Sequence, residues 1–126
     1  MASKKTPSQK YTAKKKKTRE MADKLFQILI VKMYPKCLCC GQKSTVAHHF
    51  IRKSKSNYLR YAVKNGIPLC QKCHYELHSW RDGELSGQIA LIKGDDWYQE
   101  IVGDKNKLVS TNLAWYQSKI KILEII

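Results

Sequence analysis

Residues 37–49 read CLCCGQKSTVAHH and residues 65–78 read NGIPLCQKCHYELH, and these two stretches contain every cysteine and histidine of the sequence. Each contains a Cys-x-x-Cys knuckle; the four cysteines are Cys37, Cys40, Cys70 and Cys73. Four thiolates in two such knuckles are typical of a closed, tetrahedral zinc site. Cys39 is left over, and the odd cysteine count argues against a closed disulfide framework. The sequence therefore predicts a structural Zn²⁺ with Cys39 as a spare thiol.

All the histidines lie between the knuckles or just after them, at His48, His49, His74 and His78. Residues 70–80 lack glycine and proline and are predicted to be helical, so His74 and His78 share one helical face. Residues 45–51 are strand-like, and neighbouring residues of a strand point to opposite sides. One of His48 and His49 can therefore join the helical pair around a metal ion while the other addresses a water molecule.

These residues carry a resemblance: residues 37–78 resemble the zinc-stapled HNH endonucleases. The matching pieces are Cys37-x-x-Cys40, His48-His49, Asn65 and Leu69-Cys70-x-x-Cys73-His74-x-x-x-His78. The resemblance implies an α+β fold with a small, treble-clef-like ββα-metal core, in which a β-hairpin and a helix hold a divalent cation. It also implies hydrolysis of phosphodiester bonds in DNA that leaves 5′-phosphate and 3′-hydroxyl ends.

The same resemblance implies roles for individual residues. His49 is expected to be the general base. Asn65 is expected to tether the loop between His49 and Asn65 and to orient that base. His48, His74 and His78 are expected to hold the catalytic ion. Imidazole ligands favour Zn²⁺, Mn²⁺ or Ni²⁺, whereas Mg²⁺ prefers oxygen ligands, although it is kept as a candidate.

A weaker resemblance covers more of the chain, from a basic N-terminal helix to a helical end with Trp-Tyr landmarks. This arrangement is similar to the NinG (Rap) family of recombination nucleases of lambdoid phages. It implies a role in phage recombination or DNA processing in the cytoplasm of a bacterial or phage-infected host cell. Those relatives carry Gly-His where this chain has His48-His49.

The charge points to a polyanionic partner, because 24 Lys and Arg face 10 Asp and Glu for a net charge of +14. Residues 1–36 carry net +9, residues 37–83 net +6 and residues 84–126 net −1. The segment between His49 and Asn65 has no acid, and its basic residues are Arg52, Lys53, Lys55, Arg60 and Lys64. These residues are predicted to contact the DNA backbone with low sequence specificity, with Arg52 as the phosphate clamp.

The remaining chain is read as a single domain over residues 18–126 behind a disordered basic tail over residues 1–17. The tail is a DNA-backbone arm, a localisation patch or simply a solubilising segment. The domain is predicted to comprise an N-terminal helix (18–34), the ββα core (37–81) and a helical extension (84–126). The longest apolar run, residues 28–31, is too short to span a bilayer, so no membrane partner is expected.

Two other functions fit parts of the sequence. A non-catalytic zinc-finger module that binds nucleic acid would need only the knuckles and the charge. A structural interaction protein would use the nearly neutral helical end. The choice between DNA and RNA, between branched and linear substrates, and the oligomeric state are left open by the sequence.

Overall fold

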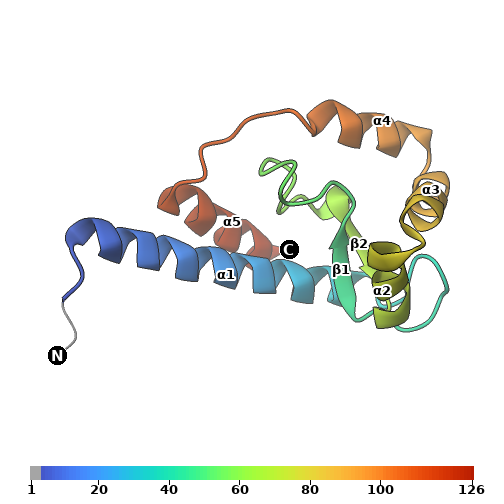
Figure 1. The fold of residues 1–126 in the computed structure, drawn as a ribbon, viewed down its shortest axis with the longest axis horizontal. Coiled ribbons are helices and arrows are strands. Elements are labelled where there is room, and N and C mark those ends of the chain that lie inside the picture. Colours follow the sequence, from blue (N-terminus) through green and yellow to red (C-terminus); the bar gives the residue numbers. More distant parts are fainter. Residues whose placement is uncertain (1–3) are drawn as a thin grey trace.

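The N-terminal helix α1 (Pro7–Met33) is the longest element of the computed structural model, which describes residues 4–126 (Figure 1). Thr6 caps it, because its hydroxyl accepts the Gln9 amide at 3.2 Å while the Gln9 side chain accepts the Thr6 amide at 2.8 Å. The disordered tail predicted over residues 1–17 is therefore corrected: residues 7–17 open this helix, and residues 1–3 lie outside the described part. The capping box and helix-favouring Lys, Gln and Ala outweigh the low apolar content.

The second half of α1 packs against α5 (Leu113–Ile125), the last helix of the chain. The buried face of α1 consists of Ala22, Phe26, Leu29 and Ile30, and α5 contributes Tyr116 and Leu123 to the same apolar cluster. Met21 and Met33 of the same helix are exposed and lie outside this buried face. Figure 1 shows α5 crossing the middle of α1, with the basic N-terminal turns of α1 extending beyond it.

A two-stranded antiparallel sheet stands on α1. Strand β1 (Val46–His49) pairs with β2 (Gly66–Leu69), with Val46 opposite Leu69 and His49 opposite Gly66. All of β2 is buried, and a Cβ atom at Gly66 would lie 2.7 Å from Ile30 Cδ1 and 2.9 Å from Phe26 Cζ. The close approach of β2 to α1 therefore requires glycine at this position.

Three helices follow the sheet: α2 (Gln71–Ser79), α3 (Asp82–Lys93) and α4 (Asp95–Asp104). They enclose a second apolar cluster whose buried members include Ile67, Leu69, Leu77, Leu85 and Ile89. The Trp97 indole of α4 donates to the Lys64 carbonyl at 2.8 Å, in the short 3₁₀ helix η1 (Val63–Asn65). This bond fixes α4 beside the segment that enters β2.

The α+β class is confirmed: the chain consists of helices around one small sheet, together with a cysteine cluster that could bind a metal ion. Strand β1 lies within the strand-like segment predicted over residues 45–51, and α2 lies within the helix predicted over residues 70–80. The helical extension predicted over residues 84–126 corresponds to α3, α4 and α5, with α3 beginning slightly earlier, at Asp82. Across residues 4–126, no helix is both long enough and apolar enough to cross a membrane.

Candidate functional site

The two cysteine knuckles meet. The Sγ atoms of Cys37, Cys40, Cys70 and Cys73 all lie within 4.8 Å of one another, so these residues form a group that could hold a metal ion. The first knuckle is a turn in which Gly41 donates to the Cys37 carbonyl at 2.9 Å and adopts a φ of 78°. In the second, Cys70 caps α2 and its Sγ atom accepts the Cys73 amide at 3.4 Å.

The spacing of the thiols fits a tetrahedral ion. Four sulfur atoms bonded to such an ion at about 2.3 Å lie about 3.8 Å apart, and Cys40 Sγ is 3.6 Å from Cys70 Sγ. Cys39 lies outside this group. Burial and the neighbouring thiolates of Cys37 and Cys40 raise the pKa of Cys39 to about 11, so it stays a protonated thiol near neutral pH.

Three histidines form a second group that could hold a metal ion. Ring nitrogens of His48, His74 and His78 all lie within 4.8 Å of one another. His74 Nε2 and His78 Nε2 are 3.0 Å apart, and two nitrogens bonded at about 2.1 Å to one ion lie about 3.0 Å apart in octahedral and about 3.4 Å apart in tetrahedral geometry. Burial and the charges of the other two histidines lower the pKa of His48 to about 3, which keeps its nitrogen lone pair available at neutral pH.

An open cavity of about 230 Å³ lies against this histidine group. It is lined by Gln27, Ala47, His48, His49, Arg52, Lys53, His74 and His78. The lining includes two cations, Arg52 and Lys53, and no acid, so the side chains that line the cavity are neutral or positive.

His49 is held in one orientation. Its Nε2 atom lies 2.8 Å from the Arg60 carbonyl, which can only accept, so Nε2 carries the proton and a neutral ring keeps its lone pair on Nδ1. Phe26 stacks on the ring at 4.9 Å between centroids. Burial, together with the charges of Lys53 and Arg60, lowers the pKa of His49 to about 4 against the opposing effect of the carbonyl bond. His49 is therefore an oriented, neutral imidazole at the cavity wall.

Asn65 is fully buried and lies away from the cavity. Its Oδ1 atom accepts the Ile51 amide at 2.8 Å, and its Nδ2 atom donates to the carbonyls of Ile51 at 3.0 Å and Leu59 at 3.2 Å. One amide thus closes the segment between Ile51 and Leu59. The Arg60 carbonyl that orients His49 follows Leu59 directly, so Asn65 acts on His49 through the backbone.

The five basic residues predicted to contact DNA divide into two sets. Arg52 and Lys53 line the histidine cavity, and Lys55 lines a neighbouring hollow. Arg52 is exposed and forms a long, 3.6 Å ion pair with Asp82, which water screens. These three residues remain accessible to a phosphate.

Arg60 and Lys64 differ from the prediction, because the structure directs them into internal ion pairs. Arg60 donates two hydrogen bonds to the Asp23 carboxylate, at 2.9 and 2.7 Å, and its side chain is only 13% exposed. Lys64 binds Glu100 and Asp104 of α4. The carboxylate partners of Arg60 and Lys64 lie far away in sequence. The acid-free stretch that contains these two cations therefore gave no sign that they form ion pairs.

Gln27 is a structural residue of the site that the sequence reasoning missed. Its side chain accepts the Ala47 amide at 2.7 Å and donates to the Ala47 carbonyl at 2.8 Å, as a neighbouring strand would. These bonds hold β1, and with it His48 and His49, against α1. The sequence feature that could have identified Gln27 is a polar residue among the apolar residues of the second half of α1.

Comparisons with protein-family models, curated proteins and solved structures return no match for this chain. The chemistry of the cavity and of the two groups that could hold a metal ion is therefore the basis for proposing a function.

Proposed function

We propose that this chain is a metal-dependent HNH-type endonuclease that hydrolyses phosphodiester bonds in DNA. One observation carries the proposal: three imidazoles that could share a metal ion adjoin an oriented neutral His49 in a cavity edged by Arg52 and Lys53. A metal site, a base and phosphate-binding cations within one open cavity are the components that phosphodiester hydrolysis requires.

Each component has a distinct task. His49 takes a proton from the attacking water at Nδ1, the nitrogen that its bond to the Arg60 carbonyl leaves free. Arg52 and Lys53 bind the oxygens of the phosphate and hold it in the cavity. His48, His74 and His78 would hold a catalytic divalent ion, Zn²⁺, Mn²⁺, Ni²⁺ or Mg²⁺, which when bound supplies Lewis-acid stabilisation of the phosphate and of the leaving 3′ oxygen.

The cysteine group serves this site indirectly. We assign it a structural Zn²⁺, because a closed set of four thiolates is the ligand set that this ion prefers. Cys73 immediately precedes His74 on α2, so fixing the start of this helix also fixes the histidine pair. In a chain with two small apolar clusters, such an ion contributes directly to folding.

DNA is proposed as the substrate on the resemblance to the HNH endonucleases, and the cations at the cavity suit its phosphates, which are common to all sequences. Cleavage is therefore expected to show little sequence preference. A role in phage recombination, within a bacterial or phage-infected cell, rests on the resemblance to the NinG (Rap) nucleases.

Plasmid nicking tests the proposal. Zinc-loaded protein is incubated with supercoiled plasmid and Mn²⁺, Ni²⁺, Zn²⁺ or Mg²⁺, beside His49→Ala and the control Tyr75→Ala, which alters an exposed side chain of α2. Wild type and control should nick, and His49→Ala should be slower by about 100-fold or more. Equal rates for wild type and His49→Ala would overturn the catalytic role. DNA binding by the wild type without nicking under any ion would favour a non-catalytic zinc-finger module.

A further inference from the structure

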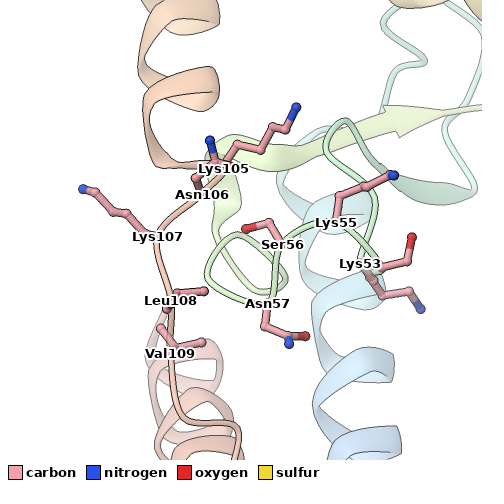
Figure 2. Close-up of a pocket in the computed structure, with 10 residues that line it drawn as sticks. Lys53, Lys55, Ser56, Asn57, Lys105, Asn106, Lys107, Leu108 and Val109 are labelled. Carbon is pink, nitrogen blue, oxygen red and sulfur yellow. The ribbon is translucent and has the colours of Figure 1, made fainter.

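Two further hollows adjoin the histidine cavity. Counting the histidine cavity as the first, the second hollow is lined by Phe50, Ile51, Arg52, Lys55, Lys105 and Asn106, and it shares Arg52 with the histidine cavity. The third lies between residues 53–57, here called the basic loop, and residues 105–109, the linker that follows α4 (Figure 2). Lys55 and Lys105 belong to both of these hollows. The three hollows therefore form one continuous path over the surface.

The path is positively charged. Within residues 4–126, no ion pair forms at Lys53, Lys55 or Lys105. Lys107 differs, because its amine binds the Asp104 carboxylate at 2.7 Å and lies 5.2 Å from the centre of the Tyr58 ring. Figure 2 shows the Lys107 side chain pointing away from the basic loop, whereas Lys55 and Lys105 line both hollows. Asp104, the carboxylate nearest to the linker, is already bound by Lys64 and Lys107.

Both walls of the third hollow are ordered without a ligand. In the basic loop, the Lys55 and Ser56 amides donate to the Arg52 carbonyl at 2.9 and 3.2 Å, and the buried Ser56 hydroxyl accepts the Leu59 amide at 3.1 Å. On the other side, the linker follows Asp104, the last residue of α4, and Lys64 of η1 binds this carboxylate. The backbone on both sides of the third hollow is thus fixed without a ligand, so a ligand that binds there loses little loop entropy.

We propose that Lys105 and Asn106 of the linker form a second phosphate-binding site, which together with Lys55 holds the nucleic-acid backbone beyond the histidine cavity. This inference rests on the proposed function, because it extends the path of the same substrate. Repeated phosphates along a strand match a continuous row of unpaired lysines, and the amide of Asn106 is a donor suited to a phosphate oxygen. The C-terminal third, nearly neutral in net charge, contributes to binding through this one exposed segment.

Salt-dependent binding tests the site. The affinity of a fluorescent 30-base-pair duplex is measured by anisotropy over a range of salt concentrations, without an added divalent ion, for zinc-loaded wild type, Lys105→Gln and Lys55→Gln/Lys105→Gln. Lys121→Gln removes the same charge from α5, outside all three hollows, and is the control. The slope of log K against log salt should fall by about 1 for the single and about 2 for the double variant. At 0.15 M salt the single variant should bind about fivefold more weakly.

An unchanged slope for Lys105→Gln, or an equal change for Lys121→Gln, would overturn the linker site. Absence of wild-type binding would overturn it as well. A further arm adds inorganic phosphate at constant ionic strength; if phosphate abolishes the difference between wild type and Lys105→Gln, the linker binds a free anion rather than a backbone. The nicking assay tests the proposed function separately. If the wild type does not nick DNA but the salt slopes of the variants fall as expected, only the catalytic proposal is wrong. If the wild type nicks DNA and the slopes of the variants equal that of the wild type, only the linker site is wrong.

Discussion

Replacing Asn65 by alanine tests how far one buried amide controls the loop beside the candidate site. The change removes hydrogen bonds of 2.8, 3.0 and 3.2 Å to Ile51 and Leu59. Each contributes about 1 kcal/mol net, and the stranded backbone groups add to the cost, so we expect a loss of about 3 kcal/mol. For a domain of this size, the melting temperature should fall by roughly 10 °C.

The assay is urea and thermal unfolding of zinc-loaded protein, followed by circular dichroism and tryptophan fluorescence. Asn57→Ala, on the exposed part of the same loop, is the matched control and should change stability by less than about 0.5 kcal/mol. Asn65→Asp should be at least as damaging as the alanine variant, because it places an anion against two carbonyl groups. Equal stability of Asn65→Ala and Asn57→Ala would refute the claim that this amide closes the loop.

The remaining predictions concern the core, the pH dependence and the metal. Gly66→Ala should cost about 1–3 kcal/mol in urea unfolding because its Cβ overlaps the core, whereas Gly87→Ala on α3, where a Cβ meets nothing, should be neutral or stabilising. Burial would raise the pKa of Asp23, but hydrogen bonds from Arg60 and Tyr61 hold it below its usual value. The stability that this depressed pKa contributes is present above about pH 4 and is lost as the pH falls through the folded-state pKa. The urea midpoint of Asp23→Asn should therefore decline less steeply than that of the wild type between about pH 5 and pH 2. Parallel declines of the two midpoints would contradict this. Elemental analysis should find tightly bound zinc retained by Cys39→Ser and lost by Cys40→Ser, and equal contents would contradict the assignment of ligands.

Much of the site could be predicted because its signals are local. The spacing of Cys70, Cys73, His74 and His78 is fixed by one helix, so their relative positions follow from its periodicity. The antiparallel pairing that brings His48 to this helix follows from two short strand-like segments. The start of α1 was also visible, since Thr6-Pro7-Ser8-Gln9 is a capping box with proline at the first helical position, but the basic composition favoured disorder.

The charge pairing could not be predicted, because it depends on residues distant in sequence. Arg60 is bound by Asp23 across 37 positions, and Lys64 meets Asp104 across 40. A count of loop charges treats these cations as free, whereas the fold pairs them with carboxylates. Among residues 4–126, no carboxylate forms an ion pair with Lys53, Lys55 or Lys105. The net charge predicts a polyanionic partner, but the tertiary structure determines which lysines remain accessible to it.

The closure of the loop by Asn65 has an evolutionary consequence. The amide binds only backbone groups of Ile51 and Leu59, so it places no demand on the side chains of residues 52–55, which are exposed. Mutations there can alter how a substrate is gripped while the anchor points, and the carbonyl that orients His49, stay in place. Such a division lets new substrate preferences arise by single surface changes, and it marks residues 52–55 as the segment to diversify in a directed-evolution library.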